Sequence, residues 1–292
     1  MRSWKLMIPL FLLGVLVLSC EQDNLVTEDA IAPEVIEKIS KMGFNPDGIE
    51  RVEEGYRIEQ DIIITHENLA VAPTEHRVPN AEQYHTFNLV SAGGGRTISV
   101  YMSVEGSGGG GGNGNGKGKK GGGGSGDFSA IYGAALDQAI FRFNSEPLDL
   151  NFSRTDNSNA DIVFTRLSKG DERRGILGSA GFPTASGDPY GEIKMSGILE
   201  SRYGLSENGI ATIIAHEMGH CIGFRHTDWF NRSISCGSGG SEGQETTGVG
   251  AVHIDGTPTG AKLSDKSWML SCTDGSNRLF NTDDKRALDY LY

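Results

Sequence analysis

Residues 216–226 read His-Glu-Met-Gly-His-Cys-Ile-Gly-Phe-Arg-His, and this run predicts both a fold class and a metal site. His216 and His220 are four residues apart, so on a helix they lie on one face, with Cβ atoms about 5–6 Å apart. Gly223 stands where such a helix has to end, because glycine readily adopts the left-handed conformation found there. The turn that follows returns His226 towards the other two histidines. The spacing therefore predicts three imidazoles around one metal ion.

Three imidazoles leave the fourth position of a tetrahedral zinc ion open, which is typical of catalytic and not of structural zinc sites. Glu217, next to the first histidine, is placed to accept a proton from a water at that position. A short His-Glu-x-x-His motif alone occurs by chance in proteins that bind no metal. Here the pattern fixes five positions over eleven residues, and apolar residues recur at helical spacing from Ile210 to Ile222. We therefore favour a zinc site over a coincidence.

The run resembles the extended motif of the metzincin clan of zinc peptidases, in which a methionine-containing turn follows the third histidine. Residues 267–271 (Ser-Trp-Met-Leu-Ser) are the candidate turn, with Met269 expected beneath the metal. Within the clan, residues 216–231 are most similar to the bacterial dual-action HEIGH metallopeptidase family, and the likeness extends over residues 83–292. It implies an α+β, zincin-like domain: a twisted mixed sheet, an active-site helix and a Met-turn.

The resemblance also implies the roles of individual residues. The zinc ligands would be the three histidines of the motif, His216, His220 and His226. Glu217 would be the general base. Some metzincins have a tyrosine ligand two residues after the methionine, but that position is Ser271 here, so no such ligand is expected. A strand near Ala180, Gly181 and Phe182 would hold an extended substrate by strand addition.

The first nineteen residues are typical of a secretory signal peptide, with Arg2 and Lys5 before an apolar stretch. That stretch, residues 6–18, is shorter than the roughly 20 residues of a membrane span. Residues 17–20 resemble a bacterial lipobox, in which Cys20 would be lipid-modified and would anchor the mature chain. The alternative is an ordinary cleaved signal peptide beside an unimportant cysteine. We expect a lipid-anchored protein of the bacterial cell envelope, facing either the periplasm or the exterior.

The remaining cysteines are consistent with an oxidising compartment. Cys221 lies in the apolar stripe of the expected active-site helix and should be a buried thiol. Cys236 and Cys272 lie in loop-rich sequence after that helix, so we predict a disulfide between them. The chain has 26 basic and 38 acidic residues and a formal net charge of −12. This balance argues against nucleic acid or an anionic membrane surface as a partner.

Residues 20–82 are interpreted as a tether followed by a small, propeptide-like region, and residues 83–292 as the metallopeptidase domain. A glycine-rich run at 106–126 cannot form a packed core and is read as a flexible insertion. In the smaller region, Cys20 is the only cysteine, so a thiol that blocks the metal is excluded. Asp61 could block it instead, as an aspartate does in some metzincins, but a solvated or strand-end acid is favoured.

The other expected elements follow from apolar patterning and capping residues. Pro33 should open a short helix, and Thr282 should cap the last one. Further expected elements are strands at 56–64, 96–102, 148–152 and 160–165 and a helix around 131–143. Asp228 either orients a zinc-bound histidine or only forms a turn. His253 has no ligand spacing and is expected to be a surface or structural histidine.

Together these patterns predict a zinc-dependent endopeptidase that acts on protein or peptide substrates. The alternative is a non-catalytic, surface-binding lipoprotein built on a metzincin scaffold. All three histidines and Glu217 are intact, which weighs against the alternative. Substrate specificity and calcium binding are not readable from the sequence.

Overall fold

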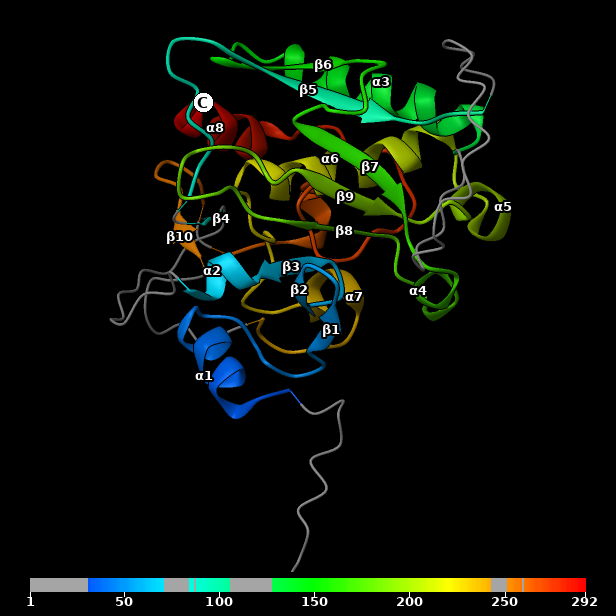
Figure 1. Ribbon diagram of the computed structural model, residues 1–292. Coiled ribbons are helices and arrows are strands. Elements are labelled where there is room, and N and C mark those ends of the chain that lie inside the picture. Colours follow the sequence, from blue (N-terminus) through cyan, green and yellow to red (C-terminus); the bar gives the residue numbers. More distant parts are fainter. Residues whose placement is uncertain (1–30, 71–83, 87, 106–127, 243–250, 259) are drawn as a thin grey trace, which may run out of the picture. The chain divides into compact units, whose positions relative to one another are not determined.

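In the part of the chain that the structure describes, eight strands form one twisted sheet against which helices pack (Figure 1). The computed structural model describes residues 31–70, 84–86, 88–105, 128–242, 251–258 and 260–292. The strand order is β1-β2-β3-β8-β9-β7-β5-β6. The strands are β1 (Glu50–Val52), β2 (Gly55–Ile58), β3 (Ile62–Thr65), β5 (Arg96–Met102), β6 (Leu150–Arg154), β7 (Ile162–Arg166), β8 (Gly178–Gly181) and β9 (Glu192–Met195).

A second, two-stranded sheet and the helices complete the described elements. The small sheet pairs β4 (Tyr84–His85) with β10 (Val252–His253) in antiparallel fashion. The helices are α1 (Pro33–Lys41), α2 (His66–Ala70), α3 (Ala130–Asn144), α4 (Lys169–Arg174), α5 (Leu199–Tyr203), α6 (Glu207–Ile222), α7 (Ser233–Cys236) and α8 (Thr282–Leu291), with a 3-10 turn at Leu263–Asp265.

The large sheet is mixed in direction. Strands β6, β5, β7 and β9 are mutually parallel, whereas β8 runs antiparallel to β9. Strand β3 is parallel to β8, and β1, β2 and β3 form an antiparallel meander at that end of the sheet. This is the α+β, zincin-like architecture that the family resemblance implied, and the fold class is therefore confirmed.

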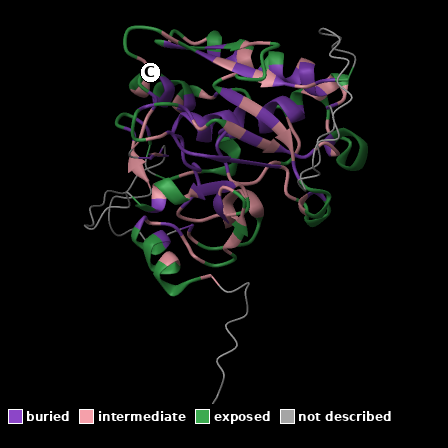
Figure 2. Cartoon of the chain, in the orientation of Figure 1, coloured by how far each residue is buried: buried purple, intermediate pink, exposed green. Residues whose placement is uncertain are grey.

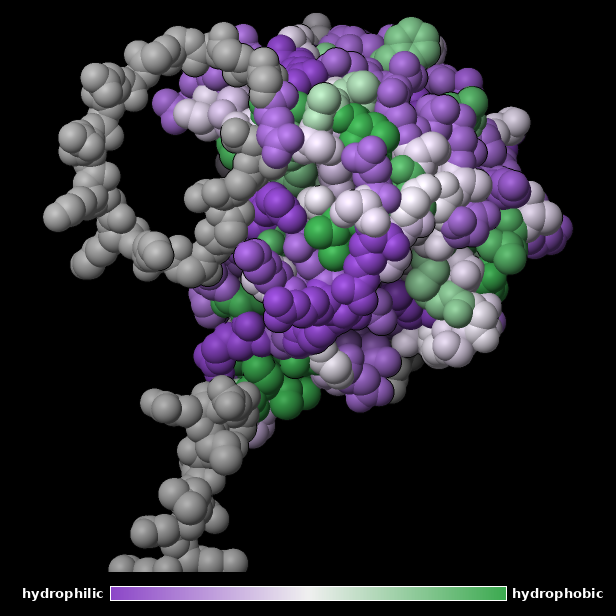
Figure 3. Space-filling view, turned by 90° about the vertical axis from the view of Figure 1, so that its right-hand side faces the viewer, coloured by the Kyte–Doolittle hydropathy of each residue, from purple (hydrophilic) through white to green (hydrophobic). Residues whose placement is uncertain are grey.

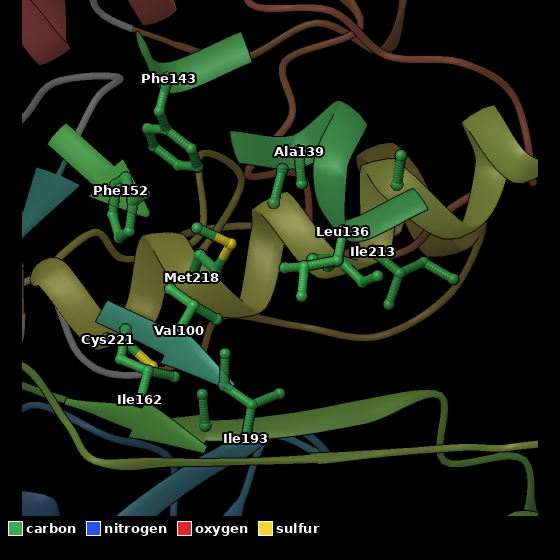
Figure 4. Close-up of a cluster of buried hydrophobic side chains, with 14 of the residues drawn as sticks. Val100, Leu136, Ala139, Phe143, Phe152, Ile162, Ile193, Ile213, Met218 and Cys221 are labelled. Carbon is green, nitrogen blue, oxygen red and sulfur yellow. The ribbon is translucent and has the colours of Figure 1, made fainter. Parts of the chain in front are cut away.

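The main core lies between the sheet and helices α3 and α6, which pack against each other (Figure 4). Val100, Ile162 and Ile193 project from three adjacent strands towards these helices. From α6, every residue between Gly209 and Ile222 is buried (Figure 2). Because α6 is buried on all sides over these residues, it is a rigid platform for the motif.

A second, smaller core joins residues 31–70 to the rest of the sheet. It contains apolar side chains from α1, β2, β3 and α2, together with Phe182, which follows β8. Phe44 stacks on Phe182 with ring centroids 6.0 Å apart. The predicted division into residues 20–82 and 83–292 stays a prediction, but strands from both regions share one sheet.

Most expected elements are present within one or two residues of their predicted bounds, and Cys221 is buried as expected. The predicted single strand at 56–64 is wrong, because β2 and β3 form a hairpin there. Its turn places Glu59 and Gln60 at φ of 54° and 80°, and neither residue is a usual turn former. The last helix is capped by Asn281 and not by Thr282. The Asn281 side chain accepts hydrogen bonds from two backbone amides of the first turn.

Several predictions concern residues outside the described ranges: the signal peptide at 1–19, the lipidation at Cys20 and the insertion at 106–126. Among the described residues, no helix is long and apolar enough to cross a membrane. On the face shown in Figure 3, hydrophobic residues form small separate patches among hydrophilic ones.

Candidate metal centre

Helix α6 fixes the first two histidines of the motif, and its end fixes the third. The helix begins at Ser206, whose side chain accepts a hydrogen bond from Gly209 N, and ends at Gly223. Gly223 has φ of 114°, and a Cβ there would lie 3.0 Å from the carbonyl oxygen of Asn88. Glycine is therefore required both by the backbone conformation and by the space. The turn brings His226 back to the helix, as the sequence predicted.

The three imidazoles converge on one point. The Nε2 atoms of His216, His220 and His226 lie 3.1–3.2 Å from one another. Ligands at 2.0–2.1 Å from a tetrahedral zinc ion would be about 3.3–3.4 Å apart, so the nitrogens need to move by only about 0.2 Å. The structure thus brings together the histidines that the sequence singled out.

Each imidazole is also held in the tautomer that a metal requires. His216 Nδ1 lies 3.0 Å from the Trp268 carbonyl oxygen, and His220 Nδ1 lies 2.8 Å from that of Phe224. His226 Nδ1 lies 2.8 Å from both carboxylate oxygens of Glu242. Because each Nδ1 donates its proton outwards, the three Nε2 lone pairs face one another. Three facing lone pairs repel unless a cation lies between them, so the donor set fits a metal ion.

Burial keeps two of these imidazoles neutral. Desolvation, aided by the charge of His226, lowers the pKa of His216 to about 4. Desolvation likewise lowers the pKa of His220 well below its usual range. Burial alone would also lower the pKa of His226, but the charges of Glu242 and Asp61 raise it well above 6.5. The site therefore favours positive charge at His226, which a bound cation can supply in place of a proton.

Glu242 is a functional residue that the sequence analysis missed. It is buried, and besides His226 it accepts hydrogen bonds from Arg232 Nη1 (2.8 Å) and Ser271 Oγ (2.7 Å). Burial would raise the pKa of this carboxyl, but the charges of His226 and Arg232 hold it well below its usual range. A carboxylate on the outer nitrogen of a metal-bound histidine orients the ring and raises its basicity. No local spacing links Glu242 to the motif.

Asp228, the predicted candidate for that role, forms its carboxylate hydrogen bonds with serines and not with a histidine in the part of the chain that the structure describes. Its carboxylate accepts hydrogen bonds from the backbone and hydroxyl of Ser271 and of Ser235. Asp228 therefore joins the segment after α6 to the segment after the methionine. The Cys236–Cys272 disulfide joins the same two segments, which confirms the predicted pairing.

The predicted Met-turn lies directly against α6. Met269 is fully buried, and its carbonyl oxygen accepts a hydrogen bond from Thr227 N (2.8 Å). A Cβ at Gly219 of the helix would lie 2.7 Å from the Met269 sulfur. The next residue back, Trp268, supplies the carbonyl that orients His216. The turn therefore packs against the helix that carries His216 and His220, as the sequence predicted.

Glu217 lies between the histidines and strand β8. A Cβ at Gly178 would lie 2.7 Å from the carboxyl carbon of Glu217, so a side chain at this position would displace that carboxyl. Among the described residues, Glu217 Oε2 has no hydrogen-bond partner. Burial, and then the charge of Asp61, raise the pKa of this carboxyl well above 4.5. A carboxyl with a raised pKa can both accept and return a proton near neutral pH.

A cavity of about 170 Å³ opens beside Glu217. Apolar side chains such as Leu177, Ile213 and Leu270 form part of its wall, and Arg278 adds a positive charge. Among the described residues, Arg278 Nε has no hydrogen-bond partner, although Nη2 lies 3.3 Å from Asp274.

Asp61 lies at a strand end, directly before β3, but the expectation that it is a solvated acid is wrong. Its carboxylate oxygen Oδ2 lies 3.3 Å from His226 Nε2 and 3.9 Å from His216 Nε2. Asp61 and the three histidines form one group of possible metal ligands within 4.8 Å of one another. The hairpin turn, which the sequence did not reveal, carries Asp61 into the site.

Two other predictions have structural outcomes. His253 lies 3.0 Å from Thr257 Oγ1 and belongs to neither group of possible ligands, in agreement with a structural role. The predicted substrate strand corresponds to β8, but its outer edge is covered, because Ala180 and Gly181 pair with Ile62 and Ile63 of β3. Phe182 is buried in the smaller core.

Comparison with known proteins agrees with the motif. A family model described as dual-action HEIGH metallo-peptidase matches residues 120–292, more than half of the chain. One solved structure of myroilysin is 11% identical, covers 70% of this chain and 96% of that chain, and has a TM-score of 0.36. A second is 12% identical, covers 91% and 98%, and has a TM-score of 0.35. No curated protein matches the chain.

Proposed function

The chain belongs to the dual-action HEIGH metallo-peptidase family and is a metallopeptidase, and from this we propose that it is a zinc-dependent endopeptidase. The observation that carries the proposal is the geometry of the three histidines. Their Nε2 atoms lie 3.1–3.2 Å from one another, and the carboxyl of Glu217 lies beside them. Nitrogen donors in this number and geometry suit zinc.

His216, His220 and His226 would hold the ion. Zinc in such a site supplies a Lewis acid and lowers the pKa of bound water towards 7. Glu217 accepts the proton of the water that attacks the peptide carbonyl, and then delivers it to the leaving amine. Two observations support both steps: Glu217 is buried, and its Oε2 has no hydrogen-bond partner among the residues that the structure describes. No serine or cysteine nucleophile is needed.

The substrate would be a protein or a peptide. An extended substrate would pair with the main chain of β8 at Ala180 and Gly181, the edge that β3 occupies in this structure. The cavity beside Glu217 is large enough for one substrate side chain. The net charge of −12 argues against nucleic acid as a partner.

We also propose that the protein acts in the bacterial cell envelope, with a lipid anchor at Cys20. The support for this location is the signal-like residues 1–19 and the lipobox-like 17–20. A disulfide between Cys236 and Cys272 suits an oxidising compartment.

The test is hydrolysis of a casein-like substrate by zinc-loaded protein, before and after limited proteolysis. Glu217→Gln should lower the rate about 100-fold or more and keep the zinc, because it removes only proton transfer. Glu207→Gln, the same change at the start of α6, is the control and should keep the rate. If neither form of the wild type cleaves substrate with zinc bound, the non-catalytic, surface-binding alternative is favoured.

A further inference from the structure

The outer edge of β8, where an extended substrate would pair, is filled by the chain itself. Strand β8 has β9 on one side and β3 on the other (Figure 1). Ile62 is paired with Ala180 and Ile63 with Gly181, and Ala180 N donates to the carbonyl oxygen of Asp61 (2.8 Å). A peptide can add to β8 only at an edge that is free. In this structure β3 has taken that edge.

The turn between β2 and β3 directs a carboxylate at the histidines. Glu59 and Gln60 both have positive φ, a conformation that residues other than glycine rarely adopt without support from their surroundings. The next residue, Asp61, is mostly buried, and its Oδ2 lies 3.3 Å from His226 Nε2. Adjacent ligands of a tetrahedral zinc ion are about 3.3 Å apart, and carboxylate oxygen is one of the usual donors. Asp61 is therefore positioned as a fourth ligand.

Ion pairs and hydrogen bonds hold the turn in place. Arg232 Nη1 donates to the Glu59 carbonyl oxygen (2.8 Å), and Arg225 Nη2 lies 3.4 Å from the buried Glu59 carboxylate. Arg232 is also a partner of Glu242, so one arginine contacts both the hairpin and the residue that orients His226. These contacts surround the metal centre and favour one position of the turn.

A second set of ion pairs fastens the hairpin farther from the histidines. Arg57 of β2 pairs with Asp171 of α4 at 2.6 Å. Glu50 of β1 pairs with Arg174 at 2.9 Å, and Glu54 pairs with Lys194 of β9. The hairpin thus matches the sheet edge by backbone pairing, by apolar packing and by charge. A chance contact would not combine all three.

We propose that Asp61 is the fourth ligand of the metal in the full-length chain, and that the β2–β3 hairpin occupies the substrate-binding edge and keeps the enzyme inactive until it leaves. Four protein ligands close a zinc site, whereas a catalytic site keeps one position open. The ligand assignment stands on geometry alone, and the inactivity rests on the function proposed above.

The ligand assignment is tested with cobalt(II)-loaded protein and acetohydroxamate, a small chelating probe that shifts the visible spectrum of cobalt when it reaches an open position. Wild type should resist the probe, whereas Asp61→Asn should bind it at least tenfold more tightly. Asp47→Asn, at an exposed aspartate of the same N-terminal region, is the control and should behave like wild type. Equal binding to wild type and Asp61→Asn would overturn the assignment.

A second measurement needs no substitution. Zinc added to the metal-free wild type should slow amide hydrogen exchange in β2 and β3 as well as in α6, by about tenfold or more, because a ligand stabilises the segments that bind it. Protection confined to α6 and the His226 turn would overturn the assignment even if Asp61→Asn failed to fold.

Measurements of casein cleavage distinguish a failure of this inference from a failure of the proposed function. Asp61→Asn should cleave casein at least tenfold faster than wild type. If it binds the probe but wild type is equally active, the inhibitory role is refuted while the ligand assignment stands. If it binds the probe and cleaves nothing even after limited proteolysis, the proposed peptidase function fails and the ligand assignment again stands.

Discussion

His226 Nδ1 lies 2.8 Å from the carboxylate of Glu242, sixteen residues farther along the chain. Both side chains are buried, and Arg232 and Ser271 hold the carboxylate from the other side. The third histidine is therefore oriented by a residue outside the motif. The position of Glu242 depends on the loop between α6 and the Met-turn.

The first prediction concerns this pair. Glu242→Gln should weaken zinc binding by about 10–100-fold, because the amide keeps a hydrogen-bond acceptor but loses the charge that raises the basicity of His226. The measurement is the zinc Kd by competition with a chromogenic chelator. Glu37→Gln, at an exposed position of α1, is the control. An unchanged Kd for Glu242→Gln would show that the carboxylate does not tune the metal site.

Gly178 tests how closely Glu217 is held against β8. Gly178→Ala should lower the rate of hydrolysis at least tenfold, because the new methyl group would lie 2.7 Å from the Glu217 carboxyl carbon and displace the proposed base. Zinc content should stay at that of wild type. Gly240→Ala, where a Cβ would meet no atom within 4 Å, is the matched control. Full activity of Gly178→Ala would argue against the proposed role of Glu217.

The disulfide should stabilise the two segments that it joins beside the metal site, one after α6 and one after Met269. Replacing Cys236 and Cys272 by serine removes a cross-link across 36 residues and should cost about 2–4 kcal/mol of unfolding free energy. For a domain of this size, that corresponds to a fall in Tm of roughly 5–15 °C, measured by calorimetry. Cys221→Ser, which alters the free buried thiol, separates loss of the bond from loss of a sulfur atom. Identical Tm values for wild type and the double variant would refute the expected contribution.

Arg278 should bias substrate choice, since it adds positive charge to a largely apolar cavity beside Glu217. Among peptides that differ only in Glu or Gln next to the cleaved bond, the Glu peptide should have the higher kcat/KM, by about tenfold. Arg278→Gln should abolish the difference and leave cleavage of the Gln peptide similar. If Arg278→Gln still prefers the Glu peptide, another residue is responsible for the preference.

The proposed lipid anchor at Cys20 can be tested in cells. Cys20→Ser should move the protein from the membrane fraction to the soluble fraction, because lipid modification requires the thiol. Fractionation followed by immunoblotting measures this, and Cys221→Ser is the control. Continued retention of Cys20→Ser in the membrane fraction would contradict the lipid anchor.

Local sequence predicted much of the fold because the elements concerned are defined by short-range chemistry. The helix around His216 and His220 follows from apolar spacing, and its end from a glycine that must adopt positive φ. The hairpin at Glu59 was missed, since Glu59 and Gln60, the turn residues with positive φ, are not residues that usually signal a turn. Residues 56–64 are rich in strand formers on both sides of the turn, so the pattern reads as one strand.

What the sequence determined by itself is the set of three imidazoles and their neighbour Glu217, because 3.6 residues per turn and one glycine fix their arrangement locally. Only the tertiary structure decided which carboxylates surround them. Glu242 and Asp61 reach the site through a loop and through a hairpin from a distant part of the chain. Such contacts depend on how the chain returns through space, and no residue spacing encodes that path.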